Sequence, residues 1–145
     1  MAIVALFTFV FGVYRVDDTS MSPNLNPGDL VFYYRLDKKY IVGDVLLYQY
    51  EGKSQLGRVT ASPNDQVDIN EGGFMVNGSY QYEPKIYKDT LALQGGISFP
   101  LTLGEGELFL MSDNRDQARD SRMFGPLPKD KVAGKVFTLL RRRGI

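Results

Sequence analysis

A serine in a short polar turn is the residue best placed to do chemistry in this chain. It lies in the sequence Ser20-Met21-Ser22-Pro23, just after an apolar run. A serine hydroxyl is a weak nucleophile at neutral pH and needs a neighbouring base. The chain contains no histidine and no cysteine, which excludes a Ser-His-Asp triad, a thiol nucleophile and a zinc–cysteine site. The base must therefore be a Lys, Asp, Glu or Tyr with a shifted pKa.

Three other stretches are more polar than packing alone requires. They are a turn leading into a strand at residues 40–45, the segment 57–65, and the segment 112–126. Eight of the first eleven residues of the last segment are ionisable or carry a side-chain amide. The simplest interpretation of any one stretch is a solvated loop with weak surface ion pairs.

The composition is that of a globular protein. The chain has 145 residues, of which 43% are hydrophobic and 23% charged, enough for one domain with its own core. Basic and acidic residues balance at 17 each, so there is no general reason to expect a nucleic-acid partner. We also expect no cofactor and no metal.

Residues 2–13 are almost wholly apolar. A helix that spans a bilayer needs roughly 20 such residues, so this run is too short to cross by itself. Two interpretations remain: a buried first strand, rich in Val, Ile and Phe, or the end of a membrane anchor. Taken alone, the segment favours the buried strand.

The rest of the chain is dominated by strand signals. They predict strands at residues 30–34, 44–50, 55–60, 74–76, 79–82, 108–111 and 135–141, with one short helix near residues 116–122. Residues 51–54 are predicted to form a hairpin loop, and Asn77-Gly78 is a strong turn for a second hairpin. The chain is therefore predicted to be mostly antiparallel β, with an insert at about residues 70–107.

Taken together and in this order, these segments resemble the type I signal peptidase family, from about residue 11 to residue 136. Ser20-Met21-x-Pro23 matches the family's nucleophile segment. The remaining four matches are Pro27-Gly28-Asp29, Gly43-Asp44-Val45, Val76-Asn77-Gly78 with Glu83-Pro84, and a last segment that contains Asp113-Asn114-Arg115 and Asp120-Ser121-Arg122 with Gly125. Agreement of order, spacing and residue type at five places makes the resemblance specific.

The resemblance implies a mostly β, signal-peptidase/LexA-like antiparallel fold with an inserted β-hairpin subregion. Residues 1–12 would be the end of an N-terminal membrane anchor and the first strand, which reverses the preference stated above. Residues 13–69 and 108–145 would form the catalytic-type β core, and residues 70–107 the inserted subregion. The protein would lie at the cell membrane with a single anchor and its soluble domain on the extracytoplasmic side.

The resemblance also implies a Ser-Lys dyad, and this chain departs from it. Ser20 holds the nucleophile position, but Gly57 stands where the family has the lysine base, and Ala118 where it has the serine that orients the lysine. Asp18 replaces a hydroxyl that helps to hold the oxyanion in some members, although the Ser20 N–H could still serve. Lys53 would be about 13 Å from position 57 along a strand, in the predicted turn.

Other site residues follow from the same resemblance. Met21 and Pro23 are expected to contact substrate. A structural ion-pair network is expected to brace the active-site loop, and its members are Arg58, Asp65, Asp113, Arg115, Asp120 and Arg122.

Two functions are compatible with this sequence. In the first, the protein holds an extended peptide, preprotein or pilin segment without cutting it. It would then resemble the lysine-less, pilus-associated members of Gram-positive bacteria, which assist pilin assembly beside sortases. In the second, it is an active signal peptidase, a serine endopeptidase with an unusual base. The absence of both Lys and Ser at positions 57 and 118 favours the first.

Overall fold

The computed structural model describes residues 2–116 and 119–141. In chain order the elements are α1 (Ala2–Val10), β1 (Phe11–Arg15), β2 (Leu30–Tyr34), β3 (Val45–Tyr50), β4 (Lys53–Ala61), β5 (Gln66–Asn70), β6 (Gly73–Val76), β7 (Ser79–Tyr80), β8 (Leu101–Thr102), β9 (Glu107–Met111), α2 (Ser121–Phe124), β10 (Leu127–Pro128), the 3₁₀ helix η1 (Lys129–Lys131) and β11 (Val132–Leu140).

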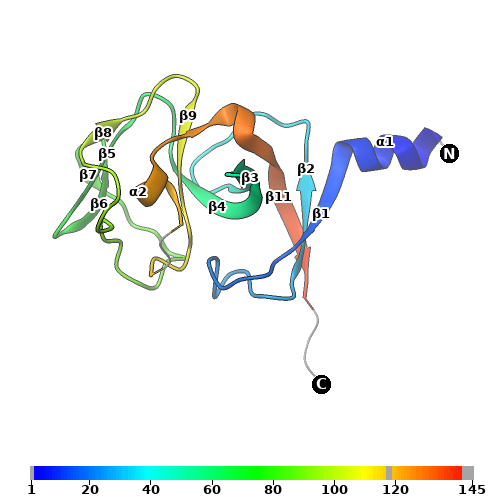
Figure 1. The fold of residues 1–145 in the computed structure, drawn as a ribbon, viewed down its shortest axis with the longest axis horizontal. Coiled ribbons are helices and arrows are strands. Elements are labelled where there is room, and N and C mark those ends of the chain that lie inside the picture. Colours follow the sequence, from blue (N-terminus) through cyan, green and yellow to red (C-terminus); the bar gives the residue numbers. More distant parts are fainter. Residues whose placement is uncertain (1, 117–118, 142–145) are drawn as a thin grey trace.

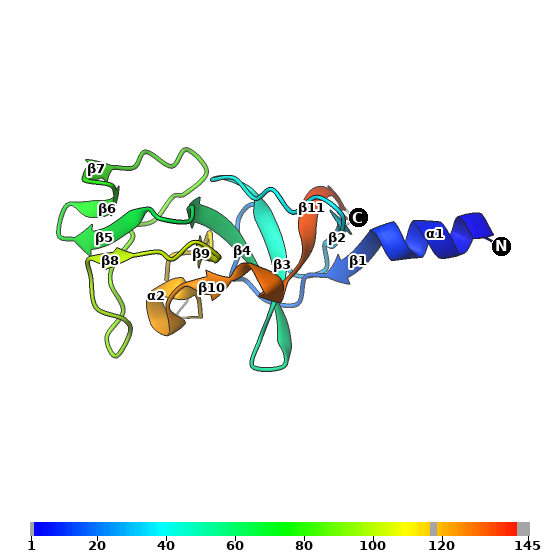
Figure 2. The same ribbon diagram turned by 90° about the horizontal axis from the view of Figure 1, so that it is seen from above.

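Two antiparallel sheets make up the fold. The larger sheet has the strand order β1-β2-β11-β3-β4-β9-β10, and the smaller one has the order β7-β6-β5-β8. The smaller sheet lies at one end of the molecule, and α1 projects from the opposite end (Figures 1 and 2). The predicted fold class, mostly antiparallel β and signal-peptidase-like, is confirmed.

Strand β9 contributes side chains to the cores of both sheets. Successive side chains of a strand point to opposite faces. Leu108 and Leu110 pack into the core of the larger sheet, while Phe109 and Met111 pack against the smaller sheet. The continuous apolar run in the sequence therefore reflects burial on both faces, and it couples the two sheets.

The N-terminal apolar run divides into a helix and a strand. None of the residues of α1 is buried, and β1 pairs with β2 over five residues, from Phe11 opposite Tyr34 to Arg15 opposite Leu30. A buried strand over residues 2–10 is therefore wrong. Within the described residues, no helix combines the length and apolar character needed to cross a bilayer.

The loop between β3 and β4 is shorter than predicted. Glu51 and Gly52 both have positive φ, 50° and 78°, the conformation that closes a two-residue hairpin turn. Tyr50 consequently pairs with Lys53. Lys53 and Ser54, predicted as loop residues, instead begin β4, and this places Lys53 on the sheet.

The second sheet is formed by residues 66–102, from β5 to β8. The sequence placed the insert at residues 70–107, so its predicted start falls at the end of β5. The predicted Asn77-Gly78 turn lies between β6 and β7, and both residues have positive φ.

Strand β11 passes so close to Tyr33 that only glycine fits at position 134. A Cβ there would collide with Tyr33 Cδ2 and lie 2.9 Å from Tyr34 O. We expect Gly134→Ala to lower the free energy of unfolding by about 1–3 kcal/mol through overpacking, as measured by urea denaturation. Gly106→Ala is the control, because a Cβ at Gly106 has no atom within 4 Å; an equal loss in both variants would contradict the packing argument.

Candidate active site

Ser20 lies in the loop between β1 and β2, and the segment after β9 holds this loop in place. The N–H of Asn114 donates to the Ser20 carbonyl at 2.8 Å. The side-chain amide of Asn114 donates to the Thr19 carbonyl at 3.1 Å. Two segments far apart in sequence thus fix the serine backbone together.

The hydroxyl and the backbone N–H of Ser20 both donate to one carboxylate. The Ser20 hydroxyl donates to Asp18 Oδ1 at 2.7 Å, and the Ser20 N–H donates to the same oxygen at 3.0 Å. The expectation that this N–H could stabilise an oxyanion is therefore corrected, because an Asx-type turn has already engaged it. A carboxylate at this place would also repel the developing negative charge.

Position 57 is buried and closely surrounded. A Cβ added to Gly57 would lie 3.1 Å from Tyr48 Cε1 and 3.2 Å from Leu110 Cβ. A lysine here would require those neighbours to shift by a few tenths of an ångström. Ala118, the position of the missing orienting serine, lies outside the described residues.

Tyr48 does not replace the absent base. Its hydroxyl donates to Gln55 Oε1 at 3.1 Å. Burial raises the pKa of Tyr48 well above its ordinary value, and the charges of Asp120 and Asp18 raise it further. The phenol therefore stays protonated at neutral pH and cannot accept the serine proton.

Two lysines, Lys53 and Lys135, have different surroundings. Lys135 is paired with Asp37 and Asp44; burial opposes its charged form, but these carboxylates outweigh burial and raise the pKa of Lys135. Lys53 is exposed, yet it lines the same cavity as Ser20. The sequence predicted Lys53 in the turn, about 13 Å from position 57, whereas the structure places it at the start of β4, where it lines the groove.

The cavity beside Ser20 is a groove along strand β4. Its volume is about 270 Å³, and it is lined by Asp17, Asp18, Ser20, Lys53, Ser54, Gln55, Leu56 and Arg119. Among the described residues, β9 pairs with β4 only from Arg58 onward. The first half of β4 therefore has β3 on one side and an open edge on the other, where an extended peptide could add as a strand. The Tyr14 hydroxyl donates a hydrogen bond to the Ser54 carbonyl at 3.4 Å.

A bidentate ion pair connects position 58 to the segment after β9. Arg58 Nε and Nη2 donate to Asp113 at 2.8 and 2.7 Å, and Arg58 Nη1 donates to the Gly43 carbonyl at 2.7 Å. Asn24 donates to the same carboxylate at 2.9 Å. Burial opposes the charged guanidinium, but the hydrogen bonds and charge of Asp113 outweigh it and raise the pKa of Arg58.

Two further arginines are buried with carboxylate partners. Arg115 forms a bidentate pair with Glu83 at 2.8 and 2.7 Å. Arg122 pairs with Asp120 at 2.8 Å, and both side chains are almost fully buried. Sequence reasoning named Arg115 without its partner; the Glu83-Pro84 match was the only signal that Glu83 had a role.

In the part of the chain that the structure describes, Asp65 forms no ion pair with an arginine of this network. Its carboxylate accepts hydrogen bonds from the Ser62 N–H at 2.9 Å and from the Asn77 amide at 3.1 Å. It closes the turn between β4 and β5, whereas Arg58 is held by Asp113. The placement of Asp65 beside Arg58 is therefore corrected.

Met21 and Pro23 also differ from expectation. Met21 is fully buried in the core with Val16 and Val31, and its sulfur lies 3.4 Å from the Asp113 nitrogen, which donates to it. Met21 therefore has no exposed surface with which to contact a substrate. Pro23 is exposed and does not line the cavity at Ser20.

Comparison with known proteins identifies the family of this chain. The model of the family described as signal peptidase, peptidase S26, matches residues 1–140. The chain belongs to this family. Among curated relatives, signal peptidase I of Bacillus caldolyticus is 31% identical and signal peptidase I of Bacillus licheniformis 29%. The matches span 92% and 87% of this chain, and 81% and 74% of those proteins.

A solved structure shows the same fold. A signal peptidase I from Enterococcus faecalis superposes with a TM-score of 0.56 at 23% identity, covering 69% of this chain and 97% of the other. S26 signal peptidases are membrane-associated, and preproteins with signal peptides are their substrates. The present S26 member is thus a signal-peptidase-like protein.

Removing one partner of the buried Asp120–Arg122 pair leaves an uncompensated charge. We expect Asp120→Ala to lower the free energy of unfolding by about 3–5 kcal/mol, measured in guanidinium chloride. Lys88→Met is the control, because the Lys88–Asp116 pair is exposed and such pairs contribute about 1 kcal/mol or less. Equal effects in the two variants would contradict a structural role for the buried pair.

The pair between Asp29 and Arg141 should make stability depend on pH. Hydrogen bonds from Arg141 hold the pKa of Asp29 below its ordinary value. The stabilisation is therefore complete above about pH 5 and is lost as the pH falls through the lowered pKa. We expect Arg141→Gln to destabilise the protein at pH 7 and progressively less below about pH 4, measured by thermal unfolding. Arg15→Gln, at an exposed position, should show no such trend.

Proposed function

We propose that this protein is a non-cleaving member of the signal peptidase family that binds an extended peptide, preprotein or pilin segment as an accessory factor. The observation that carries the proposal is the environment of Ser20. Its hydroxyl donates to Asp18, and the position of the family's lysine is a buried glycine beside Leu110 and a protonated Tyr48.

The chemistry of proton transfer supports inactivity. A carboxylate is a much weaker base than an amine, so Asp18 accepts the hydrogen bond of the serine hydroxyl without generating an alkoxide. The same carboxylate holds the only N–H that Ser20 could offer to an oxyanion. Loss of one member of a nucleophile–base set can cost roughly 10⁴-fold in rate.

Peptide binding does not depend on that chemistry. The open edge of β4 offers backbone hydrogen-bonding groups next to the groove. Backbone pairing gives affinity for extended chains largely irrespective of sequence, and the flanking side chains select among them. A groove of this kind can retain a ligand that it does not cut.

Location and partners follow from the family and the surface. We place the domain on the extracytoplasmic side of the cell membrane with a single N-terminal anchor. This is supported by the exposed apolar side chains of α1, which include Ile3, Leu6, Phe7 and Phe9. The likeness to lysine-less members suggests a role in surface pilus assembly beside sortase and pilin proteins. This part of the proposal rests on analogy.

One observation favours an active enzyme. Lys53 lines the cavity of Ser20, so a substrate that buried its amine could lower the pKa of that amine and turn it into a base. In that case cleavage would require both Ser20 and Lys53.

The first test is cleavage of a preprotein by the purified full chain in detergent or a bilayer. We expect no product at the signal junction, and we expect Ser20→Ala to bind a fluorescent signal-peptide segment with unchanged affinity. Cleavage that both Ser20→Ala and Lys53→Ala abolish would establish the active alternative. Matched Lys38→Ala should have no effect, because Lys38 is exposed and does not line the groove.

The second test restores the missing groups. Gly57→Lys, Ala118→Ser and Asp18→Ser together should produce cleavage, because they supply a buried amine, its hydroxyl partner and a free Ser20 N–H. The same triple variant with Ser20→Ala is the control and should be inactive. Unfolding should be measured in parallel because a side chain at position 57 crowds Tyr48. A well-folded triple variant without activity would show that more than the base is missing.

A further inference from the structure

We propose that Lys53 and Arg119 form a carboxylate-binding clamp at one end of the peptide groove, so that the bound peptide carries an acidic group there. This inference deepens the proposed function and rests on it, since it names the chemical class of the peptide. The clamp is defined by these two cations together with the Gln55 amide.

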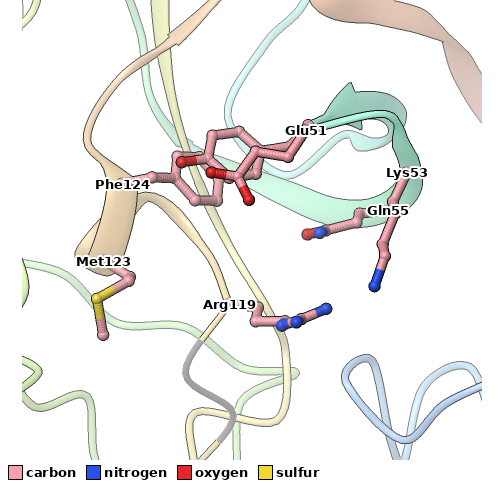
Figure 3. A pocket seen from close by; sticks show the side chains of 7 residues that line it. Glu51, Lys53, Gln55, Arg119, Met123 and Phe124 are labelled. Atoms are coloured by element: carbon pink, nitrogen blue, oxygen red, sulfur yellow. The ribbon is translucent and has the colours of Figure 1, made fainter.

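The donors come from two separate segments. Lys53 and Gln55 are two residues apart on β4, so their side chains point to the same face of the strand. Arg119 precedes α2. Figure 3 shows the Lys53 and Arg119 side chains extending toward one another, with the Gln55 amide beside them. Amine, amide and guanidinium groups thus converge on one space, which is the donor set that binds a carboxylate.

The two cations lack a carboxylate partner among residues 2–116 and 119–141, where neither Lys53 nor Arg119 forms an ion pair within 4.0 Å. Asp17 and Asp18 line the same cavity as the two cations, and Asp18 accepts a hydrogen bond from the Ser20 hydroxyl. Within the described residues neither of these carboxylates forms an ion pair with Lys53 or Arg119. Two like charges directed at one space repel each other, and a bound anion removes that repulsion.

The clamp is continuous with the groove at Ser20. Lys53, Gln55 and Arg119 line both the cavity of Ser20 and a neighbouring cavity of about 220 Å³. The neighbouring cavity also contains Tyr50 and Phe124, whose rings stack at 4.0 Å. A peptide paired with β4 would pass from Ser20 to the clamp and then to this apolar wall.

The strand spacing sets where the acidic group should lie. The residues of β4 that line the cavity with Ser20, from 53 to 56, extend over roughly 10 Å of the strand. The acidic group should therefore lie within about three residues of the peptide position that faces Ser20. An aromatic or aliphatic residue next to it would contact Phe124.

The experiment measures the affinity of the full chain for extended decapeptides with blocked ends, by fluorescence anisotropy at low salt. One Glu is moved through the sequence, and each peptide has a Gln twin. We expect the Glu form to bind about tenfold more tightly than its twin at one position, as charge-assisted hydrogen bonds predict. A peptide with a free carboxyl end and its amide twin show whether a chain terminus is bound as well as a side chain.

Variants assign the preference to the clamp. The Glu-to-Gln affinity ratio should fall to about one in Lys53→Gln and in Arg119→Gln, and should remain unchanged in the surface control Lys38→Gln. Lys53→Glu should reverse the preference and favour Lys over Gln at the same peptide position. A wild-type ratio of one at every position, or a ratio unaffected by the Lys53 and Arg119 variants, would overturn the clamp while leaving peptide binding itself intact.

A small anion separates this inference from the proposed function. 3-Phenylpropionate carries the carboxylate and a ring for the apolar wall, and NMR follows the Lys53 and Arg119 side chains during its titration. If 3-phenylpropionate causes saturable shifts that Lys53→Gln removes, but none of the decapeptides binds, the clamp is supported and peptide binding is contradicted. If neither the decapeptides nor 3-phenylpropionate bind, both the clamp and the proposed peptide binding are overturned.

Discussion

The ion pair between Arg58 and Asp113 joins three distant parts of the chain at one point. Arg58 comes from β4, Asp113 from the segment after β9, and Asn24 from the loop that follows Ser20. Asp113 is almost completely buried, and a buried carboxylate is tolerated only when its oxygens are satisfied. The charge therefore requires these segments to meet, and their meeting holds the loop of Ser20 against β4 and the segment after β9.

Nothing in this arrangement needs a catalytic amine. The arginines at positions 58, 115 and 122 each have carboxylate and carbonyl partners within the fold. The charges of these arginines are thus compensated without any contribution from position 57. In the proposed non-cleaving protein the architecture is compatible with the absence of a base, because the interactions that build the site do not involve position 57.

Under the proposed function, the same separation would allow peptide binding without catalysis. Peptide addition to β4 uses backbone groups and the shape of the groove, whereas peptide cleavage needs a neutral amine and a free oxyanion donor. Asp18 removes the donor by engaging the Ser20 N–H and leaves the groove open. Within the described residues, Lys53 and Arg119 form no ion pair, and the proposed clamp uses their charges to bind a ligand.

The sequence by itself determined the strand pattern, the Asn77-Gly78 turn, the position of Ser20 and the absence of a lysine at position 57. These are local or positional properties, set by alternation, turn chemistry and residue type. Tertiary structure alone decided that Asp18 engages the Ser20 N–H, that Glu83 pairs with Arg115, that Asp65 caps a turn instead of joining Arg58, and that Lys53 faces the groove. Such contacts depend on strand register and on loop closure between distant segments. A change of one or two residues in a turn moves a side chain to another place on the sheet without altering the residue pattern.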